Sequence, residues 1–255
     1  MRRLNMLVRL CSGLAMGSVL FIGCAEKPLP RMDSYLGATG QADRTTVSDR
    51  FKNVNGQVDV GLLLVNDTSF PGSAPALSDK GKAFLTDQVK QRISTATPVQ
   101  IVKVLMPPDS SSHHNTVELA GLAKEQGLSY VLLALFSSEE SEVYALLPLG
   151  GDPQQGGGRP FVPGFETNNF ALVELALIRS ADGEIVARSH GRAWSRLNRL
   201  NVPMESNAYP VIHRSLRVAP IYPPEKDAKD ILRSIAGDEA LEQAVMHLEE
   251  AWPKS

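Results

Sequence analysis

Three mainly hydrophobic runs lie in the first half of the chain: Val58–Val65, Val99–Leu105 and Tyr130–Phe136. Apolar runs of this length, bounded by turn residues, are typical of strands buried on both faces. Between the runs, apolar residues recur at helical spacing from Ser78 to about Ser94 and from Asn115 to Gly127. Alternating strands and helices predict right-handed crossovers and a sheet with a parallel core.

Polar residues at the ends of the two helical patterns support these boundaries. Ser78 can accept a backbone N–H at the start of the first helix. Asn115 and Glu118 have the spacing of a capping box, with Asn where Ser or Thr is usual, and Gly127 is suited to end the second helix. The sequence therefore predicts β, α, β, α, β in this order.

The second half of the chain begins with a hairpin pattern. Phe170–Ile178 and Ile185–Trp194 flank Asp182-Gly183, a dipeptide typical of tight hairpin turns. The Pro- and Gly-rich stretch Pro148–Gly164 precedes the hairpin, and an irregular, Pro-punctuated segment follows it from Asn198 to Pro224.

A final helical pattern runs from Glu225 to Trp252, with a bend expected at Gly237-Asp238. The complete order is βαβαβ followed by a β-hairpin and a C-terminal helix. The predicted fold class is α/β, a mixed sheet with helices packed on it, formed by a single domain over residues 58–255.

The N-terminus has the features of an export signal. Arg2, Arg3 and Arg9 precede the apolar run Leu10–Ile22, which is too short for a spanning helix, and Cys24 follows. The segment resembles a bacterial lipoprotein signal, which implies that residues 1–23 are removed and that Cys24 carries lipid. The alternatives are an ordinary secretory signal with an accidental cysteine and an uncleaved anchor.

Cleavage before Cys24 would leave it as the only cysteine, because Cys11 lies in the removed segment, so no disulfide is expected within a monomer. The full chain has a net charge of −2. Residues 1–23 hold three arginines and no acid, so the chain that remains after their removal has a net charge of −5. An acidic chain is a poor candidate for nucleic-acid binding, which depends on Lys and Arg neutralising phosphates. In lipoproteins of enteric-type bacteria, Asp after the cysteine favours the inner membrane. Ala25 and Glu26 therefore favour the outer membrane, facing the periplasm.

Residues 24–57 are predicted to be a flexible tether of the lipidated cysteine. They are mostly polar, small or charged, and their few apolar residues show no period. As a flexible coil this segment would reach on the order of 30 Å from the membrane. Tyr35-Leu36 and Phe51 are the residues within it that could dock on the domain.

Motifs for metal, cofactor or nucleophilic chemistry are missing from the sequence. It has no HExxH, no paired CxxC and, after the signal, no GxSxG. His113-His114 are expected to be solvated loop residues rather than metal ligands. Glu139, Glu140 and Glu142 are expected to keep a strand end soluble, and Gly156–Gly158 to form a flexible loop. We therefore expect no cofactor apart from the covalent lipid and no catalytic residue.

The last hairpin strand carries a cationic row at alternate positions, which a strand places on one face. The row follows Val186 and consists of Arg188, His190, Arg192, Trp194 and Arg196. It could bind an acidic partner protein, glycan strands or lipid headgroups, with Trp194 as an anchor. The competing interpretation is that charges on an edge strand only prevent edge-to-edge aggregation. If the row binds a partner, charge reversal at Arg188 and Arg192 should abolish its capture without lowering the melting temperature.

Three segments resemble a family of envelope proteins. They are the strand Val60–Val65, the helix and strand Leu119–Leu132 with its Tyr130-Val131-Leu132 start, and the hairpin Val173–Ala193 around Asp182-Gly183. They look like the superfamily of the curli secretion-channel lipoprotein, the amino-terminal domain of the Tol-system translocation protein and the lipoprotein activator of a penicillin-binding protein. The resemblance implies an assembly or regulatory part of the envelope and carries over no catalytic residue.

Two classes of function follow. The first is a lipid-anchored periplasmic accessory protein that binds a protein partner in envelope biogenesis, secretion or cell-wall regulation. The second is a hydrolase or small-ligand binder whose site uses the loops at the carboxyl ends of the parallel strands, with Asn66, Asp67, Thr68 and Ser69 as candidates. A pocket joining Asp67 to His113 or His190 would favour this second class. A channel is disfavoured because Pro148–Gly164 interrupts long alternating strands. The partner and the oligomeric state stay open.

Overall fold

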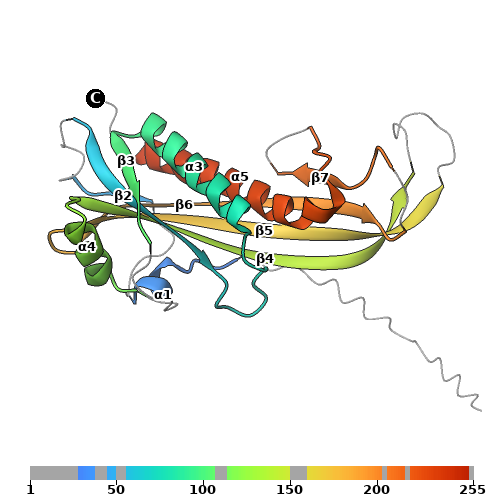
Figure 1. Cartoon of the computed structure of the whole chain (residues 1–255), viewed down its shortest axis with the longest axis horizontal. Helices are drawn as coiled ribbons and strands as arrows, with labels where there is room; N and C mark the ends of the chain where they lie inside the picture. Colours follow the sequence, from blue (N-terminus) through green and yellow to red (C-terminus); the bar gives the residue numbers. More distant parts are fainter. Residues whose placement is uncertain are drawn as a thin grey trace, which may run out of the picture.

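The computed structural model describes residues 28–37, 45–49, 56–106, 114–149, 160–202, 206–215 and 219–252. These residues form a seven-stranded sheet in the order β1-β6-β5-β4-β2-β3, with β7 paired to β6 (Figure 1). The strands are β1 Thr46–Val47, β2 Val58–Asp67, β3 Val99–Val104, β4 Tyr130–Pro148, β5 Phe161–Arg179, β6 Ile185–Leu200 and β7 Val211–Arg214. The helices are α1 Met32–Leu36, α3 Asp79–Ala96, α4 Thr116–Glu125, the short η1 Glu225–Asp227 and α5 Ala228–Ala251.

The sheet is mixed, as the sequence predicts. β2 pairs in parallel with β3 and β4, whereas β5 pairs antiparallel with both β4 and β6. The start of α4 has both hydrogen bonds of a capping box: Glu118 N donates to Asn115 Oδ1 at 2.9 Å, and Asn115 N donates to the Glu118 carboxylate at 3.3 Å. Ser78 Oγ accepts from Gly81 N at 3.1 Å at the start of α3. The α/β fold class is confirmed.

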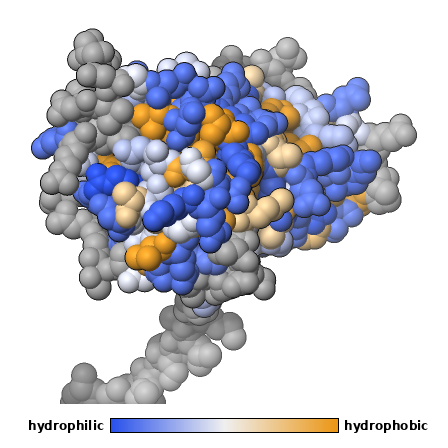
Figure 2. All heavy atoms as spheres, turned by 60° about the vertical axis from the view of Figure 1, so that its left-hand side comes forward, coloured by the Kyte–Doolittle hydropathy of each residue, from blue (hydrophilic) through white to orange (hydrophobic). Residues whose placement is uncertain are grey.

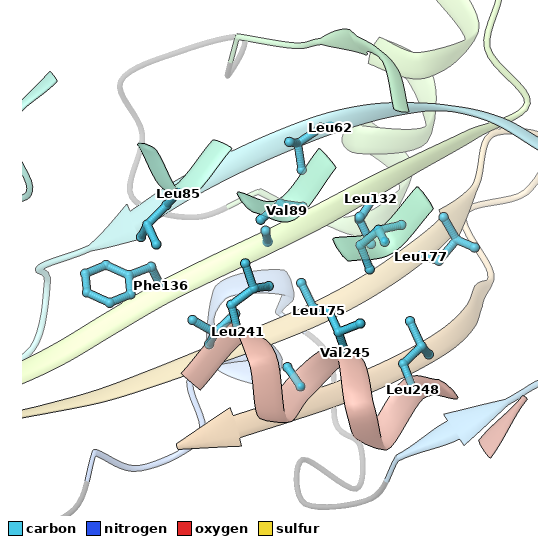
Figure 3. Close-up of a cluster of buried hydrophobic side chains, with 14 of the residues drawn as sticks. Leu62, Leu85, Val89, Leu132, Phe136, Leu175, Leu177, Leu241, Val245 and Leu248 are labelled. Carbon is cyan, nitrogen blue, oxygen red and sulfur yellow. The ribbon is translucent and has the colours of Figure 1, made fainter. Parts of the chain in front are cut away.

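Helices cover the two faces of the sheet at the end where β2 and β3 lie (Figure 1). We call the face under α3 and α5 the α5 face, and the face under α1 and α4 the α1 face. Figure 3 shows the core of the α5 face, where side chains from both helices meet those of β2, β4 and β5. Its labelled members are Leu62, Leu85, Val89, Leu132, Phe136, Leu175, Leu177, Leu241, Val245 and Leu248. A second core on the α1 face includes Leu63, Leu133, Leu135, Leu119 and Tyr35.

The helix α5 runs without interruption through Gly237, where the sequence suggests a bend. A Cβ at this position would lie 3.0 Å from the side chains of both Leu85 and Phe136. The glycine is therefore explained by the close packing of α5 on α3 and the sheet.

The strand β4 is much longer than its apolar run. It continues past Phe136 to Pro148, so the glutamates expected to mark a soluble strand end lie inside the strand. Glu140 accepts from Arg233 Nε at 2.8 Å, and Glu142 pairs with Lys229 Nζ at 2.9 Å. The prediction was wrong because both partners lie near the start of α5, about ninety residues away, and no local pattern reveals them.

The predicted interruption at Pro148–Gly164 is also wrong in its described parts. Pro148 still pairs with Phe161, and Gly164 lies within β5. Beyond the hairpin, β6 continues to Leu200, and β7 lies inside the segment predicted to be irregular. Long strands are thus present, and the argument that their lack disfavours a channel no longer holds.

Part of the segment expected to be a tether packs on the α1 face. Met32, Tyr35 and Leu36 of α1 are buried there, and β1 pairs with Arg188 and Ala187 of β6. Phe51, Cys24 and the signal segment lie outside the described residues. The docking of Tyr35-Leu36 that the sequence allows for is therefore present in the structure.

Candidate partner-binding surface

The five side chains of the predicted cationic row lie on the α1 face of β6. They alternate with Ser189, Gly191, Ala193 and Ser195, which are buried on the opposite side. The strand is not a free edge. On its outer side β1 pairs with residues near Arg188, and β7 pairs from Ser195 onward.

Between β1 and β7, side chains of α5 cover the outer edge of β6. Gln243 Oε1 accepts from the Arg192 backbone N–H at 3.3 Å. His247 Nδ1 lies 2.8 Å from the His190 carbonyl oxygen, so this nitrogen must donate. Because the outer edge of β6 is covered, the interpretation that the row only prevents aggregation at an open strand edge is wrong.

Two arginines of the row are engaged within the molecule. Arg188 Nη2 pairs with Asp33 of α1 at 2.5 Å, and its side chain is only 13% exposed. Arg196 Nε donates to Asn168 Oδ1 at 3.1 Å, lies 3.4 Å from Glu166 and lies over the ring of Trp194 at 5.7 Å. Trp194 itself is 39% exposed. Arg188 thus holds α1, whereas Trp194 and Arg196 remain at the surface.

The alternative site after β2 is occupied by contacts within the chain. Asp67 accepts from Ser69 N and Oγ at 2.9 and 2.6 Å and pairs with Arg31 Nε at 3.1 Å. Burial alone would raise the pKa of Asp67, but the hydrogen bonds from Ser69 and the Arg31 guanidinium hold it below its ordinary value. Asn66 Oδ1 accepts from Leu77 N at 2.8 Å. This cluster closes the loop and holds the segment ahead of α1.

The prediction that His113 and His114 are solvated is wrong for His114. This residue is buried and its ring meets Tyr35 edge-on at 5.9 Å, because α1 covers it. His113 lies outside the described residues. Among the residues that the structure describes, no three His, Cys, Asp or Glu side chains gather as a metal site would require.

Glu174 of β5 is a buried acid that the sequence pattern does not single out. Its Oε2 accepts the backbone N–H groups of Arg31 at 2.7 Å and Met32 at 3.0 Å. Burial raises the pKa of Glu174 to about 7, although these bonds and the charge of Arg188 act in the opposite direction. The carboxylate thus fixes the entry to α1 on the sheet.

Exposed aromatic and aliphatic side chains gather near the far end of the β4–β5 hairpin. Tyr144, Leu146 and Phe161 are 61%, 62% and 61% exposed. Tyr144 pairs in register with Phe165, their rings meet edge-on at 6.1 Å, and Arg199 lies over the Phe165 ring at 4.7 Å. We call Tyr144, Leu146, Phe161 and Phe165 the tip patch.

The tip patch lies on the α5 face, since its positions alternate in step with Phe136 and Val173. In Figure 1 this part of the hairpin extends beyond the helices, at the right. Figure 2 turns the opposite end of the molecule forward, and that view is mostly hydrophilic with scattered hydrophobic residues. The apolar sequence Val143–Leu147 was the signal for this patch, but the preceding glutamates obscured it.

A groove of about 810 Å³ lies where the starts of α3 and α5 meet. Apolar walls come from Phe84, Ile221, Ile231 and Ile235, and charged side chains such as Lys80, Lys226 and Asp227 line it as well. Ser78 ties the two helices together by donating its N–H and Oγ–H to Asp230 at 2.9 and 2.5 Å. The residues that line the groove do not include Asp67 at the carboxyl end of β2.

Among the described residues, no helix combines the length and apolar character needed to cross a membrane. No family model matches the chain, and no curated protein matches it. The solved structures similar to it include a PelC dodecamer from Paraburkholderia phytofirmans, at 10% identity and a TM-score of 0.35, covering 81% of this chain and 95% of that one. A point variant of the PelC dodecamer from that organism aligns at 13% identity and a TM-score of 0.29, covering 64% of this chain and 84% of that one.

Proposed function

We propose that this chain is a lipid-anchored accessory protein of the cell envelope that acts by binding a protein partner through the tip patch. The observation that carries the proposal is the exposure of Tyr144, Leu146 and Phe161 side by side at the end of a long, rigid hairpin. Contiguous exposed apolar residues mark interaction sites on soluble domains. Aromatic side chains beside arginine are the residues on which binding energy concentrates.

The location of the patch suits this role. The hairpin strands β4 and β5 pair without a break from Tyr130 to Pro148, so the patch is held on a continuous ladder rather than on a loop. Rigid presentation lowers the conformational entropy that binding must overcome. Charged groups nearby, including Arg199 and Glu142, which lie 3.3 Å apart, form a polar border.

The proposed location in the cell envelope rests on the N-terminal sequence. A signal ending at Cys24 supports export and acylation, and Ala25-Glu26 after it favours the outer membrane with the domain in the periplasm. The resemblance to envelope assembly and regulatory proteins supports a role in biogenesis, secretion or cell-wall regulation. Trp194 and Arg196 remain candidates for a second contact on the α1 face.

Affinity capture from crosslinked envelopes tests the proposal. We expect the wild-type chain to recover a defined envelope protein and the double variant Tyr144→Ser, Phe161→Ser to lose it. The matched control is Tyr222→Ser, which removes a 58% exposed aromatic ring outside the tip patch. Equal recovery by the double variant, with unchanged thermal unfolding, would contradict binding through the patch.

Small-ligand binding is the second candidate, and the groove between α3 and α5 is the observation that favours it. Its size and apolar walls are those of sites that take small organic ligands. The variant Ile231→Glu introduces a charge into this groove and leaves the tip patch intact. If a small apolar fluorescent probe binds the wild type and the Tyr144→Ser variant but not the Ile231→Glu variant, the groove is a ligand site; equal binding by all three would contradict it.

A further inference from the structure

We propose that the domain rests against the membrane with its α1 face, held there by residues 28–37, and presents the tip patch away from the lipid. The partner of the α1 face is the phospholipid headgroup layer of the membrane that holds the anchor. The inference rests on the lipidation of Cys24 in the proposed function. It replaces the expected 30 Å reach of a free tether with a short, directed attachment.

The attachment is made by polar contacts around Arg31. Its backbone N–H donates to buried Glu174, and its guanidinium binds Asp67 at 3.1 Å and Ser69 Oγ at 3.2 Å. The same guanidinium lies 5.0 Å from the centre of the Phe70 ring. One residue thus joins the N-terminal segment to both β5 and the loop after β2.

Contacts of α1 itself extend the attachment. Met32, Tyr35 and Leu36 are buried in the core of the α1 face, and Asp33 pairs with Arg188 of β6. Buried apolar side chains contribute about 1.5–3 kcal/mol each, so this short helix is held by packing rather than by its own propensity. The attachment therefore spans several strands of the sheet.

Pro28 is the first described residue and is already buried. Only four residue steps separate it from Cys24, and a fully extended chain covers at most about 14 Å in four steps. In Figure 1 the segment leading into α1 runs along the underside of the sheet, on the side opposite α3 and α5. A lipid on Cys24 must therefore enter the bilayer close to the α1 face.

The α1 face carries side chains suited to a headgroup layer. Leu29, which follows buried Pro28 in the segment leading into α1, is 71% exposed, and Trp194 is partly exposed next to Arg196. Tryptophan places an apolar ring and a polar N–H at the boundary between lipid and water. The tip patch points to the other side of the sheet, so one membrane contact and one protein contact can be made together.

Energy transfer from tryptophan to labelled lipid headgroups tests this orientation. The chain holds two tryptophans, and Trp252 packs with the core of the α5 face. Full-length acylated protein is placed in phosphatidylethanolamine–phosphatidylglycerol vesicles that contain dansyl-phosphatidylethanolamine. The Trp252→Phe variant reports Trp194, the Trp194→Phe variant reports Trp252, and Cys24→Ser protein supplies the unanchored reference.

We expect transfer from Trp194 to exceed that from Trp252 severalfold. Inserting about twelve Gly and Ser residues between Lys27 and Pro28 adds a flexible reach of roughly 20 Å and should lower the Trp194 signal while leaving the fold intact. Equal transfer from both tryptophans, or no response to the insertion, would overturn the orientation. Protein whose mass shows no acyl chain would overturn the anchoring, whereas loss of partner capture in the Tyr144 and Phe161 variants reports on the tip patch alone.

Discussion

Gly191 of β6 lies directly against the backbone of α5 at Ala240. A Cβ built on Gly191 would lie 2.1 Å from the Ala240 carbonyl oxygen and 2.4 Å from Ala244 N. Since both obstacles are backbone atoms, neither can move without shifting the helix. The position therefore requires glycine for contact between helix and sheet, not for backbone conformation.

Gly191→Ala should destabilise the fold by about 1–3 kcal/mol or more, because the added methyl group pushes α5 from the sheet. Chemical denaturation measures this loss. The matched control is Gly121→Ala in α4, where a Cβ meets nothing within 4 Å and a gain of about 0.5–1 kcal/mol is expected from helix propensity. Equal effects of the two variants would contradict the close packing of α5 on β6.

Glu174 should make the stability depend on pH. The pKa of its carboxyl is raised by burial to about 7, against an ordinary value of 4.5. The folded state therefore binds a proton that the unfolded state releases between these values, so stability falls as the pH rises from about 4.5 to 7. The expected loss is about 3 kcal/mol, from 1.36 kcal/mol per pKa unit.

The geometry allows the protonated form to keep its contacts. Oε2 accepts both backbone N–H groups of the segment ahead of α1, which leaves Oε1 free to carry the proton. Around the carboxyl lie Asp33 and Arg188, and His190 is its register partner on β6. Denaturation of Glu174→Gln between pH 5 and 8 should show a flatter profile than the wild type. An unchanged slope would assign the pH dependence to another group.

The ion pair between Arg188 and Asp33 changes what charge reversal should do. Arg188→Glu places an acid against Asp33 and near Glu174, so we expect a loss of about 2 kcal/mol in the free energy of unfolding. The swap Arg188→Asp with Asp33→Arg should recover part of it, and a double-mutant cycle measures the coupling. A melting temperature unaffected by Arg188→Glu would show that the pair does not hold α1.

The sequence predicts the elements whose signals are local. The capping box at Asn115 and Glu118, the turn at Asp182-Gly183 and the parallel strands are all found in the structure. It does not predict the length of β4, since the partners of Glu140 and Glu142 both lie on α5. When the ion-pair partners of charged residues lie far away in the sequence, the local pattern alone indicates a solvent-exposed strand end.

In the candidate site, too, the features with a local sequence pattern are predicted and those that depend on distant residues are not. Alternation along β6 places the cationic row on one face, but the Asp33 partner of Arg188 lies in a segment whose composition suggests a free tether. The tip patch depends on the pairing of Tyr144 with Phe165, a contact that only the β4–β5 register brings about. Surfaces built across strands are not visible in either strand alone.

Site-specific crosslinking at Tyr144 tests the central claim most directly. A photoreactive phenylalanine analogue replaces Tyr144 in growing cells, with the same analogue at Tyr222 as the matched exposed control. Binding through the tip patch predicts a discrete adduct with one envelope protein from position 144 and none from position 222. An adduct at position 222 alone, or none at position 144, would contradict the account.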